Sequence, residues 1–302
     1  MAATRRCATA GRRAWRVAER GARVGGTLAL LLWGTTLAGC ALFLGPRGET
    51  EQIARDAGFA AAVYPAGQFT LRGYERFEQP GGDLTVYIES DGLSYIDRNT
   101  LSADPTPAQP IVMRLASLDG ARNRLYLARP CQFLEPEALR RCDPDYWSIA
   151  RFAPEVIEGY MAALDLAKRK SGARRLILVG YSGGGAVAAL LAARRDDVGL
   201  LVTAGGTLDH RAWTSNAGVA PLRSSLNPAD FAGNLRSVRQ IHFVGERDRR
   251  VPLAVAESYM ARLGPGADAT LVRLARYDHD CCWEDGWRAL LGQYVQNAAA
   301  RP

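Results

Sequence analysis

Apolar positions along this chain follow two alternating patterns from residue 69 onward. Short continuous apolar runs, typical of buried strands, alternate with longer stretches in which apolar residues recur every three or four positions, as on one face of a helix. The predicted strands cover residues 69–77, 84–90, 124–128, 174–180, 198–204, 240–245 and 269–275, and the predicted helices cover residues 110–118, 155–170, 185–194, 252–263 and 282–297.

This alternation predicts an α/β fold. Strands that are apolar throughout are buried on both faces, so we expect a mainly parallel central sheet flanked by helices on both faces. Residues 69–298 form the predicted main domain, and residues 41–68 form an N-terminal linker and helix. Residues 207–239 interrupt the rhythm with many Ser, Asn, Gly and Pro residues and predict a loop-rich, cap-like excursion.

The net charge of +7 is concentrated at the N-terminus. The first 24 residues contain seven arginines and a single acid, Glu19, whereas the rest of the chain is close to neutral. A near-neutral body lacks the broad basic surface that binds a phosphate backbone. We therefore expect no nucleic-acid partner.

The N-terminal segment has the pattern of an export signal, because an apolar stretch at residues 24–46 follows the arginines. Within it, Leu37-Ala38-Gly39-Cys40 resembles the bacterial lipobox. This resemblance implies that residues 1–40 are a signal peptide, cleaved before Cys40, and that lipid chains such as palmitate anchor the body to a membrane of the cell envelope. Ala41 after the cysteine favours the outer membrane.

A second interpretation of the same segment is an uncleaved membrane anchor. Arg23 and Arg47 bracket 23 uncharged residues, which is enough for one helix to cross the inner membrane. Both interpretations place the body in an oxidising compartment, where disulfides form.

Four cysteines follow Cys40. Cys131 and Cys142 bound a short loop whose ends come together easily, so we expect a disulfide between them. Cys281 and Cys282 are adjacent, and pairing them closes a strained eight-membered ring; the alternative is that one or both are buried thiols. We expect no metal site, because the chain has no C-x-x-C motif and residues 278–281 are too crowded to chelate one ion together.

Residues 180–184, Gly-Tyr-Ser-Gly-Gly, match the G-x-S-x-G pattern between a predicted strand and a predicted helix. Gly180 and Gly184 allow a turn so tight that the hydroxyl of Ser182 stands exposed at the carboxyl edge of the sheet. The helix N-terminus beneath it favours developing negative charge. The alternative is a plain turn or phosphate-binding loop, but the segment lacks the Walker lysine and the G-x-G-x-x-G pattern.

A serine nucleophile needs a base, and the base needs an orienting acid. The chain has three histidines. His242 lies inside a predicted strand, as a core residue does, and His210 closely follows a strand. Only His279 comes after every candidate acid, which is the order Ser, acid, His expected for this motif.

The acid should follow the strand that ends at residue 245. Glu246 and Asp248 are available there, and we prefer Asp248 as the residue that holds His279 in the correct tautomer. Asp209, after the preceding strand, is the alternative acid, and a plain surface charge is the alternative role for Asp248.

Developing oxyanion charge needs two backbone N–H donors. Gly183, directly after the nucleophile, is the first candidate. The second is Asp91 or Gly92, because these residues end the strand at residues 84–90 abruptly. A simple turn is the alternative explanation for these two residues.

Together, Ser182, Asp248 and His279 occur in the order and at the strand ends that resemble the alpha/beta-hydrolase superfamily, over residues 69–298. The resemblance is greatest to exported bacterial lipoprotein members. It departs from the family pattern in two places: the oxyanion strand carries residues 90–92 in place of a His-Gly dipeptide, and the segment between Cys131 and Cys142 is an insertion.

The resemblance implies an esterase- or lipase-like serine hydrolase that forms an acyl-enzyme intermediate on a small-molecule carboxylic ester and needs no cofactor. A peptidase or thioesterase would use the same triad. The rival class is a non-catalytic envelope lipoprotein that uses the fold as a binding module.

Overall fold

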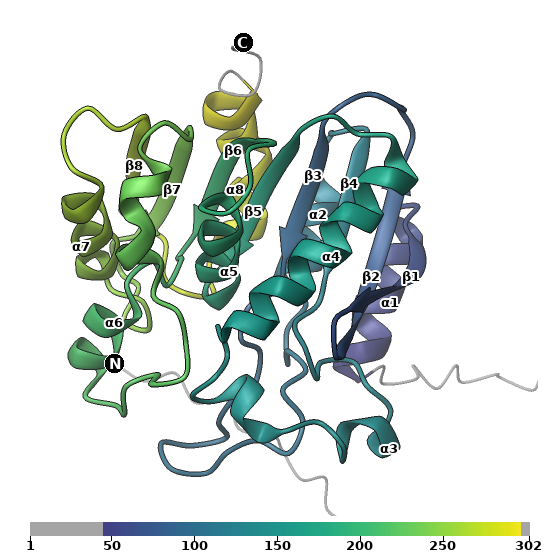
Figure 1. Cartoon of the computed structure of the whole chain (residues 1–302), viewed down its shortest axis with the longest axis horizontal. Coiled ribbons are helices and arrows are strands. Elements are labelled where there is room, and N and C mark those ends of the chain that lie inside the picture. The colour runs from purple at the N-terminus through teal and green to yellow at the C-terminus, as the bar shows by residue number, and fades with distance from the viewer. Residues whose placement is uncertain (1–44, 297–302) are drawn as a thin grey trace, which may run out of the picture. The chain divides into compact units, whose positions relative to one another are not determined.

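An eight-stranded sheet runs through residues 45–296, the part of the chain that the structure, a computed structural model, describes (Figure 1). The strand order is β1-β2-β4-β3-β5-β6-β7-β8, and all neighbours from β4 to β8 are parallel, whereas β2 is antiparallel to β1 and β4. The prediction of a mainly parallel sheet is confirmed. The strands are β1 (Ala60–Ala66), β2 (Phe69–Phe77), β3 (Leu84–Ile88), β4 (Asn123–Leu127), β5 (Leu176–Tyr181), β6 (Val198–Ala204), β7 (Gln240–Gly245) and β8 (Ala269–Leu274).

Helices cover both faces of the sheet, as the sequence predicted. One buried apolar cluster contains residues of α1, α2 and α8, and the other contains residues of α4, α5 and α7. Successive strand side chains point to opposite faces, so in β5 Leu178 joins one cluster and Val179 joins the other. The helices are α1 (Pro46–Asp56), α2 (Ile111–Leu118), α3 (Pro136–Leu139), α4 (Pro154–Ser171), α5 (Gly183–Ala192), α6 (His210–Ala217), α7 (Leu253–Leu263) and α8 (Trp283–Leu290), with shorter turns η1 (Pro144–Trp147), η2 (Pro228–Leu235) and η3 (Leu291–Val295).

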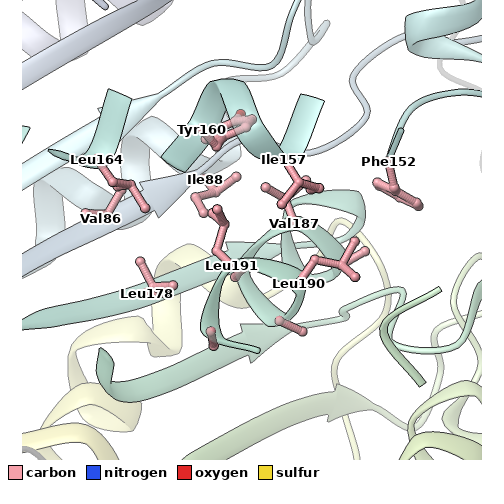
Figure 2. Packing of buried hydrophobic residues seen from close by; sticks show 14 of the residues in the cluster. Val86, Ile88, Phe152, Ile157, Tyr160, Leu164, Leu178, Val187, Leu190 and Leu191 are labelled. Atoms are coloured by element: carbon pink, nitrogen blue, oxygen red, sulfur yellow. The ribbon is translucent and has the colours of Figure 1, made fainter. Parts of the chain in front are cut away.

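Helix α5 is buried along its whole length. Its sequence is apolar on every side, which is the pattern of a helix enclosed by protein. Figure 2 shows Val187, Leu190 and Leu191 of α5 packed between α4 and the sheet. Because α5 begins directly after Ser182, this packing fixes the position of that serine.

The segment before residue 69 differs from the prediction. Residues 41–68 were expected to be linker and helix, but β1 pairs with β2 as a hairpin after α1. The sequence of β1, Ala-Ala-Ala-Val-Tyr-Pro-Ala, does not predict a strand, because alanine and proline are both rare in strands. The strand forms because it lies at the sheet edge, where proline needs no ladder partner on its free side.

Residues 207–239 contain more regular structure than a loop-rich excursion. They include α6 and η2, which pack against α7 and α5. Asp209 begins α6, because its side chain accepts hydrogen bonds from the backbone N–H groups of Arg211 and Ala212.

The predicted signal segment, its lipobox and Cys40 lie outside the described residues. Within residues 45–296, no helix combines the length and apolar character needed to cross a bilayer.

Candidate active site

The strand order reverses direction between β3 and β5. In open α/β sheets, ligands bind in the crevice outside the carboxyl ends of the strands at such a point. Here a cavity of about 650 Å³ lies beside the segments that follow β3 and β5, and both Ser182 and His279 line it. This volume is in the range of small-molecule binding sites.

Ser182 occupies the turn between β5 and α5. Its φ of 54° and ψ of −122° are unusual for a residue with a side chain and indicate local strain. A β-carbon on Gly180 would lie 2.2 Å from the carbonyl oxygen of Gly184, and one on Gly184 would lie 2.2 Å from that of Ile88. Both positions therefore exclude any side chain, which is the reason for the glycines in the motif.

The structure brings the three predicted side chains together. His279 Nε2 lies 3.1 Å from Ser182 Oγ, and His279 Nδ1 lies 2.7 Å from Asp248 Oδ2. The carbonyl of His279 accepts hydrogen bonds from the Tyr181 hydroxyl and from Trp283 Nε1. These two bonds fix the backbone of the loop, so the imidazole is held between an alcohol and a carboxylate.

Asp248 is buried, and its other oxygen, Oδ1, accepts hydrogen bonds from the backbone N–H groups of Arg250 and Val251 at 2.9 and 2.8 Å. This leaves Oδ2 for His279. Glu246, the other acid in the same loop, is exposed. Asp209, the alternative acid, instead caps α6 and accepts a hydrogen bond from Ser258.

The two other histidines are structural. His242 is fully buried between Thr203 Oγ1 at 2.9 Å and Gln240 Oε1 at 3.2 Å, and burial lowers its pKa to about 3. His210 stacks on Phe152, and burial lowers its pKa as well. Both side chains are therefore neutral at physiological pH.

Comparison with known proteins supports the fold but not a closer assignment. No protein-family model and no curated protein matches this sequence. Solved structures match across most of the chain. Esterase Pf2001 of Pyrococcus furiosus has 12% sequence identity and a TM-score of 0.59, with 82% of this chain and 95% of that chain covered.

Two further structures show the same likeness. Est1E of Butyrivibrio proteoclasticus has 11% identity and a TM-score of 0.57, covering 80% of this chain and 99% of that one. Acylaminoacyl peptidase of Pyrococcus horikoshii has 13% identity and a TM-score of 0.56, covering 80% of this chain and 41% of that one. The chain has the alpha/beta-hydrolase fold. Identities this low show the fold alone.

In this alpha/beta-hydrolase fold, two of the three predicted oxyanion donors are free. Within residues 45–296, the backbone N–H groups of Gly183 and Asp91 have no hydrogen-bond acceptor. The N–H of Gly92 instead donates to Ser90 Oγ at 3.2 Å. Gly92 has a φ of +63°, and a β-carbon there would lie 2.0 Å from the Pro105 carbonyl oxygen, so its role is to form the turn.

The side chain of Asp91 belongs to a buried ion cluster that the sequence did not reveal. Its two oxygens accept hydrogen bonds from Arg129 Nη1 at 2.9 Å and from Arg151 Nη1 at 2.7 Å. Burial alone would raise the pKa of Asp91, but the two guanidinium groups outweigh burial and lower it below its ordinary value. Arg129 follows the end of β4, which is the one sequence signal that could have placed it at this edge.

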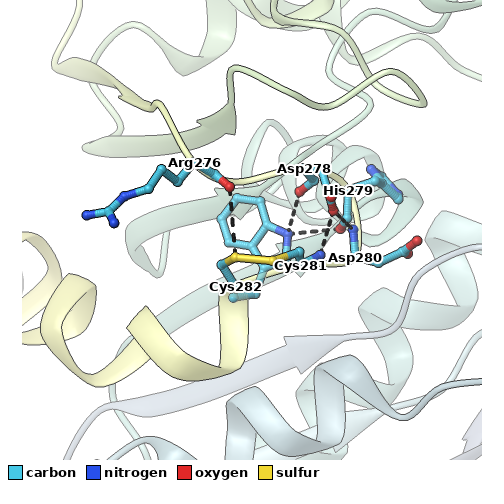
Figure 3. Close-up of a disulfide and its surroundings, with 7 residues drawn as sticks. Arg276, Asp278, His279, Asp280, Cys281 and Cys282 are labelled. Atoms are coloured by element: carbon cyan, nitrogen blue, oxygen red, sulfur yellow. Dashed lines mark hydrogen bonds between the residues drawn. A yellow bond between two sulfur atoms is a disulfide. The ribbon is translucent and has the colours of Figure 1, made fainter. Parts of the chain in front are cut away.

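The four cysteines after Cys40 form two disulfides. Cys131 is joined to Cys142, as expected. Cys281 is joined to Cys282, a pairing that we expected to be disfavoured (Figure 3). This second bond begins two residues after His279. Beside it, the Asp278 carboxylate accepts hydrogen bonds from the backbone N–H groups of Asp280 and Cys281. The segment directly after the histidine is thus constrained by a covalent bond between neighbouring residues and by hydrogen bonds.

Proposed function

We propose that the protein is a serine hydrolase that cleaves carboxylic esters through an acyl-enzyme intermediate. The observation that carries this proposal is the bridge that His279 makes between Ser182 Oγ and Asp248 Oδ2. An imidazole placed in this way accepts the serine proton at one nitrogen while the carboxylate stabilises the charge at the other.

Acylation begins when Ser182 Oγ attacks the ester carbonyl carbon and its proton moves to His279 Nε2. The carbonyl oxygen becomes an oxyanion, which accepts hydrogen bonds from the free N–H groups of Gly183 and Asp91. When the intermediate collapses, the ester C–O bond breaks. His279 then gives the proton to the departing alcohol.

Deacylation repeats these steps with water. His279 takes a proton from the water as its oxygen attacks the acyl carbon, the bond to Ser182 Oγ breaks, and the serine recovers the proton. Asp248 accepts the hydrogen bond from His279 Nδ1 throughout and stabilises the imidazolium that forms twice in each cycle. The chemistry uses no metal or cofactor.

A small-molecule ester is the proposed substrate class. The cavity beside Ser182 has apolar and polar walls and a suitable volume, and Trp213, Val219 and Leu222 from the excursion at residues 207–239 contribute to it. The structural neighbours include an esterase and a peptidase. We favour the ester because it is the substrate that this triad cleaves most easily.

The test is hydrolysis of a 4-nitrophenyl ester series, from acetate to palmitate, by the full chain in detergent. We expect turnover by the native protein and its loss in Ser182→Ala. Labelling of Ser182 by a fluorophosphonate gives a second readout that does not depend on the acyl chain. Labelling without ester turnover would favour amide or thioester substrates. If the folded protein shows no turnover and no labelling, a binding module is favoured instead.

We also propose that Cys40 carries the lipid that holds the protein in the cell envelope. The lipobox-like sequence before it supports this proposal. Metabolic labelling with a palmitate analogue should mark the native chain but not Cys40→Ala, and the mass of the mature N-terminus should correspond to cleavage before residue 40. Unlabelled protein that retains its N-terminal segment would favour the uncleaved anchor.

A further inference from the structure

We infer that Arg151 binds a carboxylate on the substrate, so that the preferred esters carry a second, anionic group. This inference rests on the serine hydrolase function proposed above. Arg151 lines the same cavity as Ser182 and His279, yet only 6% of its side chain is exposed. A charged side chain buried in the wall of a cavity requires partners for its donors.

Two of the three nitrogens of Arg151 have protein partners. Nε donates to the carbonyl of Ser148 at 2.7 Å, and Nη1 donates to Asp91 at 2.7 Å. Nη2 has no hydrogen-bond partner among residues 45–296. It is also not fully buried, so a molecule in the cavity can reach it. Because Arg151 forms part of the cavity wall, Nη2 is a charged donor available to a ligand.

The charges around Arg151 leave an excess of positive charge. Arg129 and Arg151 are both buried, and they share the single carboxylate of Asp91. Glu89, a buried acid of the same region, accepts hydrogen bonds from Ser90. Burial raises its pKa to about 7, so below that pH it is neutral and adds no compensating negative charge. An additional anion beside Arg151 would complete its set of partners.

The other acids that line the cavity do not fill this role. Asp280 is exposed and forms an ion pair with Arg250 at 2.9 Å. Asp97 is exposed and accepts hydrogen bonds from the N–H groups of Asn99 and Thr100 at 2.8 Å. Water screens both carboxylates, whereas the interaction of a ligand with Arg151 takes place in a less polar environment.

Trp213 fixes the guanidinium from a second side. Its ring centroid lies 5.7 Å from Arg151 Cζ, and its Nε1 donates to the carbonyl of Arg250 at 2.7 Å, which holds the ring in place. Ile149 and Leu222 add apolar wall to the same cavity. The site therefore suits a short apolar chain with an ester at one end, at Ser182, and a carboxylate at the other.

A neutral chain in this site would leave Nη2 without an acceptor. Sites that bind a polar group by a buried hydrogen bond reject analogues that lack it far more strongly than apolar pockets distinguish chain lengths. Arg151 is thus a specificity-determining residue for the charge of the substrate.

The test compares kcat/KM for two matched ester series with the full chain. One series consists of monomethyl esters of glutarate, adipate and suberate and of acetate esters of ω-hydroxy acids. The other has the same molecules with a terminal carboxamide in place of the carboxylate. We expect the native protein to prefer the carboxylate by at least about 10-fold. Arg151→Gln should lose this preference, and Arg151→Lys should retain part of it.

Arg129→Gln is the matched control. Arg129 also holds Asp91, but it does not line the cavity, so this variant should lower kcat for both series and keep the preference. If native protein hydrolyses carboxamide esters as well as carboxylate esters, the inference is wrong and the hydrolase function stands. This comparison decides the matter even if neither arginine variant folds.

A binding measurement separates failure of the inference from failure of the proposed function. Ser182→Ala cannot turn over its ligand, so its affinity for monomethyl glutarate and for the matched carboxamide can be measured by titration calorimetry. Tighter binding of the carboxylate, lost when Arg151→Gln is added, supports the site even if no ester is hydrolysed. Equal binding of the two ligands would overturn it.

Discussion

The carboxylate of Asp91 lies directly against the α-carbon of Gly183. A β-carbon built on Gly183 would come within 2.0 Å of Asp91 Oδ1 and 2.3 Å of its carboxyl carbon. The residue after the proposed nucleophile must therefore be glycine. It leaves room for a carboxylate that ties the end of β3 to two buried arginines.

Replacing Gly183 with alanine should disturb the site more than the fold. The new methyl group would displace the Asp91 carboxylate and with it the backbone N–H proposed as an oxyanion donor. We expect kcat/KM on a 4-nitrophenyl ester to fall by about 10²-fold or more, the usual effect of losing one such donor. Gly233→Ala is the control, since a β-carbon there meets no atom within 4 Å. Unchanged kinetics in Gly183→Ala would contradict the assignment of this donor pair.

The loop after β7 offers two acids, and substitution can distinguish their roles. Asp248→Asn keeps the shape of the side chain but favours the wrong tautomer of His279, so kcat should fall by roughly 10³- to 10⁴-fold at neutral pH. Glu246→Gln changes an exposed neighbour and should leave kcat within about twofold. Comparable losses in both variants would refute the proposed role of Asp248.

The sequence predicted the parts of the molecule in which local pattern and final structure agree. Strands β6 and β7 have the predicted ends, because both are buried apolar runs with polar or glycine residues around them. Ser182 and His279 could be placed because a short motif and the chain order of the family point to them. The structure adds the distances that bring these two side chains into contact.

The ion cluster could not be predicted, because its members are distant in sequence. Asp91 is 38 residues from Arg129 and 60 residues from Arg151. No periodic pattern marks such a pairing, and a buried arginine looks in sequence like any surface arginine. The disulfide between Cys281 and Cys282 was not predicted for a different reason: local covalent geometry disfavours a bond between adjacent cysteines.

Glu89 should make the stability of the protein depend on pH. The residue is 1% exposed, and burial raises the pKa of its carboxyl group from 4.5 to about 7 despite hydrogen bonds from Ser90 and Tyr126. Between these values the folded state holds a proton that the unfolded state has released. The stabilisation is therefore complete below pH 4.5 and is lost as the pH rises through about 7, by roughly 3 kcal/mol in total.

Glu89→Gln removes this titration and keeps the size of the side chain. Urea unfolding of both proteins at pH 5 and pH 8 gives the measurement, and the difference between the two proteins isolates this one group from all others that titrate. We expect the native protein to lose more stability than Glu89→Gln between pH 5 and pH 8. Parallel losses in the two proteins would show that Glu89 ionises in the folded state at its ordinary pKa.

The disulfide between Cys131 and Cys142 should contribute to stability and not to the chemistry. It closes a loop across 11 positions, for which chain entropy gives about 3 kcal/mol. The segment that carries the proposed oxyanion donor is held by hydrogen bonds from Gln132 Nε2 to the carbonyls of Ser90 and Pro105, and these bonds do not involve the cysteines. Cys131→Ala, Cys142→Ala and the double variant should lose similar amounts of stability in urea, because each removes the same bond, while kcat stays within a few-fold under folding conditions.

Additive losses of stability in the double variant would mean that the bond itself stabilises nothing. Reducing agent is a poorer test, since it also opens the bond between the two cysteines after His279.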